Sequence, residues 1–378
     1  MSDTTTSQTA PTDLKSLIAR ELTPHVTAID LQSYYPEPFL RAAGALGGFA
    51  DVVAPEFGGS GKGLGKTIEV MAEIGETCLS TAFVHWCQTA CARYIQLSDN
   101  ENAKRTWLPR LANGSLLGGT GLSNTCKSAC EIERHLLTAR RVEGGYEING
   151  TLPWVSNLGE SHIFVTGCPV DNDGRLVFFI TRCDQAGFQL VDAAHFTALD
   201  GTRTLACRFR QVFIPDSEVL AHPDHSAAYL ERIQPGMFLA QLGMGIGLIR
   251  DCTRMVENVG KTHAHINAYE SDQAEELRAA LTRAEQEVFR LAARLDANPS
   301  AGEIPALMTE VLRIRLAGGE LALRAANAAM LHQGARGYLR TAAAQRRLRE
   351  AYFVAIVTPS LKHLRLEIAR RENTPRAA

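Results

Sequence analysis

The spacing of apolar residues changes twice along this chain of 378 residues. In residues 14–117 apolar side chains recur every three or four positions between proline and glycine breaks, which predicts helices. Residues 118–228 alternate apolar with polar side chains, which predicts short strands joined by turns. In residues 229–378 the helical period returns in long segments with short loops, which predicts an antiparallel bundle. The expected order is a disordered terminus (residues 1–13), helices, a compact β domain and a helical bundle.

Composition narrows the classes of function. The net charge is −2 with 21% charged residues, so the chain has no basic field for nucleic acid. No apolar run approaches about 18 residues, which argues against a membrane span. The first thirteen residues have neither a basic region nor an apolar core, so they do not resemble a signal peptide. Nine cysteines, an odd number, suit a reducing cytoplasm better than a disulfide framework.

Two pairs of cysteines have a four-residue spacing. Cys87 and Cys91 lie in a helical pattern, and Cys126 and Cys130 lie in an expected loop. Metal sites more often use a two-residue gap with a second ligand pair downstream. We therefore interpret these cysteines as buried, unreactive thiols, and we expect no metal site.

The segment GYEINGTLPWVSN contains the strongest local turn signal in the β region. The pair Asn149-Gly150 lies between two alternating runs, which predicts a hairpin because both turn positions favour positive φ. On the second arm, Trp154 and Ser156 are two residues apart and therefore point to the same face. This face either presents an aromatic wall and a hydroxyl to a ligand, or holds a core tryptophan and a serine bonded to its own backbone.

Several separated motifs carry a resemblance to a known family. They are PEFGGSG (55–61), KRTWLPRLANGSLLGGTGLSN (104–124), INGTLPWVSN (148–157), VFIPDSEVL (212–220), and HQGARGY (332–338) with Arg349-Glu350 downstream. In this order they resemble the acyl-CoA dehydrogenase superfamily over nearly the whole chain. The resemblance implies an α+β fold with an N-terminal all-α domain, a central β-barrel-like domain and a C-terminal four-helix bundle.

The resemblance also implies a cofactor, FAD, held by the β domain and the bundle. Trp154 would line the isoalloxazine ring and Ser156 would reach its N5 atom. Two positions depart from the family: Ala129 replaces a pyrophosphate-binding serine, and His263 falls at or near an arginine that meets FAD across a dimer. FMN, which lacks the adenylate, is therefore the alternative. The cofactor-binding residues implied by the resemblance are Ser123, Trp154, Ser156, Gly334, Gly337 and Ser360.

The catalytic glutamate of the family has no counterpart. Its position falls on Thr358, which is followed by Pro359, and the position used by some members falls on Met237. A threonine hydroxyl has no pKa near neutrality and cannot act as a general base, a role worth about 10²–10⁴-fold. His332 and His363 are the nearest titratable side chains in the sequence and are candidates for this role.

Three functions remain open at this stage. The first is α,β-dehydrogenation of an acyl thioester or a related acyl substrate, with a relocated base and an electron acceptor protein. The second is a monooxygenase of the same fold, supplied with reduced flavin by a reductase, in which Ser156 and His85 would protect the flavin. The third is a non-catalytic flavin-fold binding protein. The family arrangement implies a homodimer or homotetramer, because FAD bridges two subunits.

Overall fold

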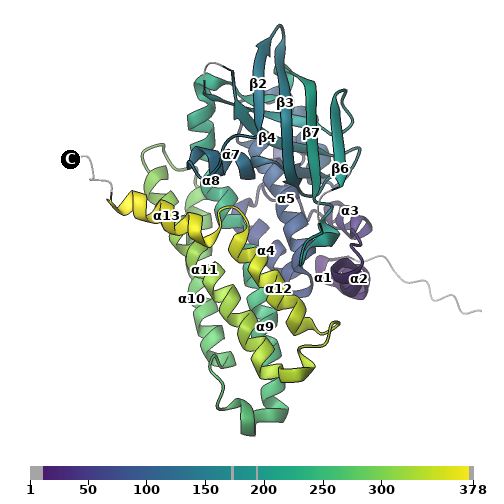
Figure 1. The fold of residues 1–378 in the computed structure, drawn as a ribbon, viewed down its shortest axis with the longest axis vertical. Coiled ribbons are helices and arrows are strands. Elements are labelled where there is room, and N and C mark those ends of the chain that lie inside the picture. The colour runs from purple at the N-terminus through teal and green to yellow at the C-terminus, as the bar shows by residue number, and fades with distance from the viewer. Residues whose placement is uncertain (1–11, 172–173, 193–194, 374–378) are drawn as a thin grey trace, which may run out of the picture.

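The computed structural model describes residues 12–171, 174–192 and 195–373. The order of helices, β domain and helices expected from the sequence is confirmed (Figure 1). Of the terminus expected to be disordered, only residues 12 and 13 are described. Asp13 caps the first helix, since its carboxylate accepts a hydrogen bond of 2.8 Å from the Ser16 amide. No described helix is long and apolar enough to cross a membrane.

The N-terminal part is helical, and its longest helix lies at the centre of the molecule. Helix α5 is buried along almost its whole length, which is typical of a helix enclosed on all sides. It therefore contacts the sheets as well as the other helices. The helices of this part are α1 (Leu14–Leu17), α2 (Val26–Leu31), α3 (Glu37–Ala45), α4 (Gly63–Thr77), α5 (Leu79–Gln96) and α6 (Glu101–Ala112).

The described residues of the central part form two four-stranded sheets, ordered β1-β4-β5-β8 and β2-β3-β7-β6. Alternate residues of β4 and β5 face the second sheet or the helices, so the first sheet lies between two apolar layers. The strands are β1 (Gly118–Thr120), β2 (Leu137–Val142), β3 (Gly145–Val155), β4 (Ile163–Pro169), β5 (Leu176–Arg182), β6 (Phe188–Asp192), β7 (Leu205–Pro215) and β8 (Val219–Ala221).

The hairpin predicted at Asn149-Gly150 is wrong. Strand β3 continues through this pair, and its pairing with β7 shifts register between Ile148 and Gly150. The turn between β2 and β3 lies earlier, where Gly144 has a φ of +74°. The Asn149 side chain instead accepts a hydrogen bond of 2.9 Å from the Gln211 amide at the bulge. Pairing along the full length of β7 therefore overrides the local turn preference.

A helix interrupts the β region where a loop was expected. Helix α7 (Leu122–Ala129) follows β1 and buries Leu122, Thr125 and Cys126, which lie on one helical face. The Thr125 hydroxyl donates a hydrogen bond of 2.6 Å to the Gly167 carbonyl of β4. Cys126 is therefore buried in a helix rather than placed in a loop.

The C-terminal part is a helical bundle that packs onto α4. The contact between α4 and α9 is close at Gly75 and Gly247, since a Cβ on Gly247 would lie 2.4 Å from the Ala72 carbonyl. Only glycine allows the two backbones this separation. The helices are α8 (Ser226–Ala240), α9 (Leu242–Asn267), α10 (Ala274–Asp296), α11 (Ile304–Gln333), α12 (Ala343–Ile356) and α13 (Leu361–Asn373).

Candidate active site

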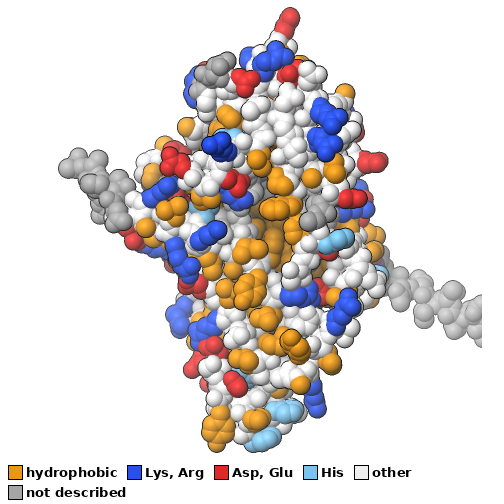
Figure 2. All heavy atoms as spheres, viewed as in Figure 1, with side chains coloured by type: hydrophobic (Ala, Val, Ile, Leu, Met, Phe, Trp, Pro, Cys, Tyr) orange, Lys and Arg blue, Asp and Glu red, His pale blue; other side chains and the backbone are white. Residues whose placement is uncertain are grey.

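A cavity of about 790 Å³ lies where the β domain meets α5 and α12. Its volume falls within the range of small-molecule and cofactor sites. On the face shown in Figure 2, apolar side chains gather around a hollow between these parts. The lining residues come from all three parts of the chain, so the cavity depends on the complete fold.

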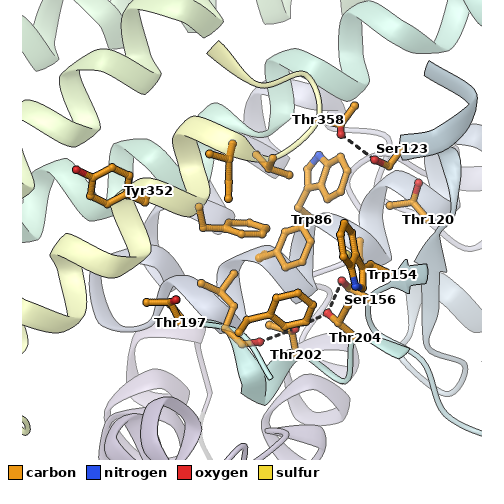
Figure 3. A pocket seen from close by; sticks show the side chains of 18 of the residues that line it. Trp86, Thr120, Ser123, Trp154, Ser156, Thr197, Thr202, Thr204, Tyr352 and Thr358 are labelled. Atoms are coloured by element: carbon orange, nitrogen blue, oxygen red, sulfur yellow. Dashed lines mark hydrogen bonds between the residues drawn. The ribbon is translucent and has the colours of Figure 1, made fainter. Parts of the chain in front are cut away.

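The β-domain wall carries the aromatic and hydroxyl side chains predicted to face a ligand. Trp154 and Ser156 both line the cavity, with Thr120 and Ser123 beside them (Figure 3). Trp154 is 56% exposed, and its ring meets Phe196 edge-on at 6.1 Å. An indole this exposed at the edge of a cavity offers a flat apolar surface to a planar ligand.

The opposite wall is apolar and comes from α5 and α12. Phe83 stacks on Trp86 with their ring centroids 5.7 Å apart, and it meets Phe353 edge-on at 4.6 Å. The Trp86 indole nitrogen donates a hydrogen bond of 3.2 Å to the Met237 carbonyl. Because this polar atom is already bonded, the wall presents mainly carbon to the cavity.

The polar groups of the cavity are largely hydroxyls that bond to one another. Ser156 Oγ lies 2.6 Å from Thr204 Oγ1, which lies 2.8 Å from Thr202 Oγ1. Ser123 Oγ lies 2.7 Å from Thr358 Oγ1, across the gap between α7 and the segment that follows α12 (Figure 3). These pairs carry no net charge.

Thr358 lines the cavity, so the position of the missing glutamate does face the site. Helix α12 ends at Ile356, two residues before it, and α13 begins only at Leu361 after Pro359. The Thr358 carbonyl accepts a hydrogen bond of 2.8 Å from Gln241, which fixes this segment against the bundle. Among the described residues that line the cavity, none is an aspartate, a glutamate or a histidine.

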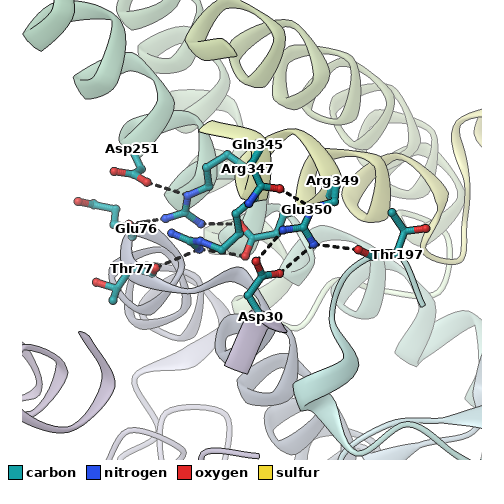
Figure 4. A network of polar contacts seen from close by, with 10 residues as sticks. Asp30, Glu76, Thr77, Thr197, Asp251, Gln345, Arg347, Arg349 and Glu350 are labelled. Carbon is teal, nitrogen blue, oxygen red and sulfur yellow. Dashed lines mark hydrogen bonds and ion pairs between the residues drawn. The ribbon is translucent and has the colours of Figure 1, made fainter. Parts of the chain in front are cut away.

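Glu350, the acid on α12, is buried away from the cavity in a network of ion pairs (Figure 4). It lies 3.0 Å from Arg346 and 2.9 Å from Arg347, and Arg347 also contacts Asp251 at 2.7 Å. A carboxylate held by two guanidinium groups is not a free base. The network therefore has a structural role.

Arg349 is the one residue of the Arg349-Glu350 motif that lines the cavity. Its guanidinium binds both oxygens of Asp30, at 2.9 and 2.6 Å, and donates a hydrogen bond of 2.8 Å to the Thr197 carbonyl. Arg349 thus joins α12 to α2 and to the loop that borders the cavity. Its charge is satisfied by Asp30.

None of the three histidines proposed for function, His85, His332 and His363, lines the cavity. His85 Nε2 bonds to the Gly48 carbonyl at 2.8 Å, on the side of α5 that faces Phe49. Burial lowers the pKa of His85 to about 4, so its imidazole is neutral near pH 7. His332 lies near the end of α11, where its Nε2 is 3.2 Å from the Ser271 carbonyl.

The remaining predicted cofactor residues also lie outside the cavity lining. Gly334 ends α11 with a φ of +57°, and a Cβ there would meet no atom within 4 Å. Gly337 follows in the same turn and closes it with a hydrogen bond of 2.9 Å to the Gly334 carbonyl. Ser360 precedes α13, and its carbonyl accepts from the Leu364 amide at 2.8 Å. Gly334 is exposed, Gly337 is buried and Ser360 is half-buried, and none of the three lines the cavity.

All nine cysteines are free. One group of the described residues, Cys130, His363 and Glu367, places its ligand atoms within 4.8 Å of one another. Burial and the neighbouring Glu367 carboxylate raise the pKa of Cys130 to about 11, and Glu367 already pairs with Arg370 at 3.2 Å. A metal ion would need the Cys130 thiolate and would compete with Arg370 for Glu367, so we assign no metal to this group.

Sequence reasoning missed several lining residues. Thr202 ends a 3₁₀ turn (Asp200–Thr202) and Thr204 follows it. Thr204 meets Ser156 because β7 pairs with β3, which is a contact between distant segments. Phe83 and Tyr352 carry a helical period that equally fits a packed core. The alternation of Thr202 and Thr204 was the only local signal, and it does not reveal their partner.

Comparison with known proteins supports the same fold. The model of the acyl-CoA dehydrogenase N-terminal domain matches residues 6–115. The chain is 25% identical, over 95% of its length and 95% of the relative's, to a probable acyl-CoA dehydrogenase of Bacillus subtilis (strain 168). This match includes the two parts that follow the N-terminal domain.

Two solved structures illustrate the range of proteins with this fold. Butyryl-CoA dehydrogenase from Megasphaera elsdenii superposes with a TM-score of 0.84 and 16% identity, over 96% of this chain and 99% of the other. The FMN-bound dibenzothiophene monooxygenase from Paenibacillus sp. A11-2 superposes with a TM-score of 0.84 and 18% identity, over 97% of each chain. At these identities the likeness shows the fold.

Proposed function

The chain belongs to the acyl-CoA dehydrogenase superfamily, and we propose that it is a flavin-dependent oxidoreductase acting on an apolar acyl substrate. One observation carries this proposal. The cavity has a wall with an exposed indole and hydroxyls on one side, and a wall of aromatic carbon on the other. A flat heterocycle fits the first wall and an acyl chain fits the second.

Residues of the β domain would hold the flavin ring. The ring would lie against Trp154, with Ser156 near N5 and with Ser123 and Thr120 near its pyrimidine side. When bound, a flavin supplies an N5 atom that takes up or releases a hydride. We propose FAD as the cofactor, with FMN as the alternative because FMN occupies the monooxygenase neighbour.

The acyl chain would occupy the apolar wall. Phe83, Phe353 and Ile356 line this side, and Ile356 is 64% exposed at its edge. Burying these carbons against a substrate would contribute about 25 cal/mol per Å² of apolar surface. By analogy with the named relatives, we propose α,β-dehydrogenation of an acyl thioester, with an electron acceptor protein as partner.

A second candidate, a reduced-flavin-dependent monooxygenase, is favoured by the chemistry of the cavity. Dehydrogenation needs a group that removes a proton, and the titratable side chains among the described lining residues are Cys87, Lys127, Arg349 and Tyr352. None of these is a carboxylate or an imidazole poised near pH 7. Hydroxylation with reduced flavin from a reductase does not require that base.

An anaerobic titration separates the two candidates. Butyryl-CoA and octanoyl-CoA are added to the flavin-loaded protein, and flavin absorbance is followed. Bleaching supports dehydrogenation. Absence of bleaching, together with an oxygen-dependent product formed only when reduced flavin is supplied, supports monooxygenation. Bound flavin with neither response would make the chain a non-catalytic flavin-binding protein.

A designed variant tests the missing base directly. In Thr358→Glu a carboxylate occupies the position that faces the cavity, and Thr358→Gln is the matched uncharged control. If dehydrogenation lacks only its base, Thr358→Glu should accelerate bleaching by about 10²-fold or more, while Thr358→Gln should not. Equal rates in both variants would favour the monooxygenase.

We further propose a homodimer or homotetramer. The far end of the bundle exposes apolar side chains from the ends of α9 and α11, and the two ends are joined by a hydrogen bond of 3.2 Å from Asn267 to the His332 carbonyl. The turn at Gly334 and Gly337 lies here, where it would approach a neighbour's cofactor. Light scattering tests this proposal, and a monomer would contradict it. The exposed side chains are Ile266, Tyr269, Leu331, Tyr338 and Leu339.

A further inference from the structure

Three hydroxyl groups form a chain along the wall of the cavity. Ser156 Oγ contacts Thr204 Oγ1 at 2.6 Å, and Thr204 contacts Thr202 Oγ1 at 2.8 Å. Thr202 then donates a hydrogen bond of 2.7 Å to the Leu199 carbonyl (Figure 3). The chain therefore ends on a group that accepts hydrogen bonds and cannot donate one.

Counting protons fixes the direction of every bond in this chain. Each hydroxyl carries one hydrogen. The hydrogen of Thr202 is used on the Leu199 carbonyl, so Thr204 must donate to Thr202. Ser156 must in turn donate to Thr204. The three hydroxyl hydrogens are all used in these three contacts, so the Ser156 oxygen has only lone pairs available to a ligand in the cavity.

The backbone holds the chain in this arrangement. The Asn157 amide donates a hydrogen bond of 3.0 Å to the Thr202 carbonyl, and the Leu158 amide donates one of 3.3 Å to the Arg203 carbonyl. Asn157 is itself buried, and its side chain donates a hydrogen bond of 2.6 Å to the Gly118 carbonyl. Segments 156–158 and 202–204 are thus fixed to each other, which keeps the three hydroxyls within hydrogen-bond reach of one another.

We propose that this chain makes Ser156 a hydrogen-bond acceptor toward the flavin and thereby favours the reduced cofactor. The inference rests on the proposed function, because it needs a flavin N5 beside Ser156. Reduced flavin carries a hydrogen on N5 and can donate to Ser156, whereas oxidised N5 has only a lone pair. A bond from Ser156 to oxidised N5 would be a fourth contact for three hydrogens, and one of the existing bonds would be lost.

Thr204 and Thr202 are therefore positioning residues that act through Ser156. Their effect is on the relative affinity for the two redox states, which a purely structural role would not change. This preference suits an enzyme that receives reduced flavin. In a dehydrogenase the same preference makes the flavin a stronger oxidant, since stabilising the reduced form raises the reduction potential.

The test compares Thr204→Val with Thr204→Ser. Valine has the shape of threonine but cannot accept the Ser156 hydrogen, which then becomes free to bond to oxidised N5. The measurement is the ratio of dissociation constants for oxidised and reduced flavin, or equivalently the midpoint potential of the bound flavin. For Thr204→Val we expect the preference for reduced flavin to fall about tenfold, a potential lower by about 30 mV for a two-electron couple. Thr204→Ser keeps the hydroxyl and should match the wild type.

The outcomes separate this inference from the proposed function. An unchanged ratio in Thr204→Val, with flavin bound normally in both states, would overturn the inference alone. An equal fall in Thr204→Ser would also overturn it, because the effect would then come from shape and not from the hydroxyl. Failure of the wild type to bind either form of flavin would overturn both the inference and the proposed function.

Discussion

The two faces of α12 differ sharply in their chemistry. One face buries Arg347 and Glu350 in a network of ion pairs, in which Arg347 is fully enclosed (Figure 4). The other face presents Leu348, Tyr352 and Phe353 to the cavity, where most polar partners are hydroxyls. Glu350, the carboxylate of α12, therefore lies on the structural face, and the described residues that line the cavity include no carboxylate.

This difference shows how the helix can be fixed while the cavity lining stays free of carboxylates. Buried charges are tolerated where each has a partner, as around Arg347, and they set the position of α12 against α4 and α9. A cavity without a carboxylate leaves the redox chemistry to the cofactor. Because Glu350 is held by the ion pairs of the structural face, it cannot replace the missing base, although it is close in sequence to Thr358.

Disrupting the ion-pair network of α12 should have the largest effect on stability. Arg347→Ala leaves Glu350 and Asp251 buried with fewer partners, so we expect the free energy of unfolding to fall by about 3–5 kcal/mol. Denaturant unfolding measures this loss. The control is Arg365→Ala, which removes an exposed ion pair with Glu320 and should cost less than about 1 kcal/mol. Equal losses in both variants would contradict the comparison.

Helix α5 also has a face at the cavity and a face away from it, and His85 lies on the face away from the cavity. Its pKa is lowered to about 4, while an unfolded histidine titrates near 6.5. As the pH falls below about 6.5 the unfolded state takes up a proton that the folded state does not, so stability is lost down to about pH 4, by up to about 3 kcal/mol. His85→Gln should show a smaller loss, whereas His195→Gln, at an exposed site, should behave as the wild type. An unaltered pH dependence in His85→Gln would show that His85 is not the group responsible.

Removing the indole from the β-domain wall should weaken flavin binding without destabilising the fold. Trp154 is 56% exposed, so Trp154→Ala should change stability little. Loss of the aromatic contact should raise the dissociation constant for flavin about 10- to 100-fold. Phe213→Ala is the control, since Phe213 is 50% exposed on β7 but does not line the cavity. A similar loss of affinity in both variants would argue against a flavin at Trp154.

The smallest effect should come from the hydroxyl pair that joins α7 to the end of α12. Ser123→Ala and Thr358→Val each remove one partner of a bond of 2.7 Å. In a double-mutant cycle on the free energy of unfolding, we expect a coupling of about 1 kcal/mol. Strict additivity of the two changes would show that this bond contributes nothing.

Periodicity predicted the fold, but it could not predict contacts between distant segments. The spacing of apolar residues in 14–117 and 229–378 predicted helices, and the alternation of apolar with polar residues between them predicted the strands. The hairpin at Asn149-Gly150 failed because β7 pairs along all of β3, which a local turn preference cannot anticipate. Helix α7 was missed because its eight residues are too few to display a clear period.

The candidate site was predictable where two residues share one strand face. Trp154 and Ser156 line the cavity together, as their spacing predicted. The position of His85 depends on the rotation of a helix that is buried all round, and its sequence does not reveal which side meets the cavity. Thr202 and Thr204 reach Ser156 only through the pairing of separate segments, so nothing near Ser156 in the sequence reveals them.

The measurement that tests the central claim most directly is the visible absorption spectrum of the purified chain, before and after addition of FAD or FMN and gel filtration. The account predicts that flavin absorbance elutes with the protein, because the indole of Trp154 and the neighbouring hydroxyls form a site for the ring. A colourless protein from which all added FAD and FMN separates would contradict it.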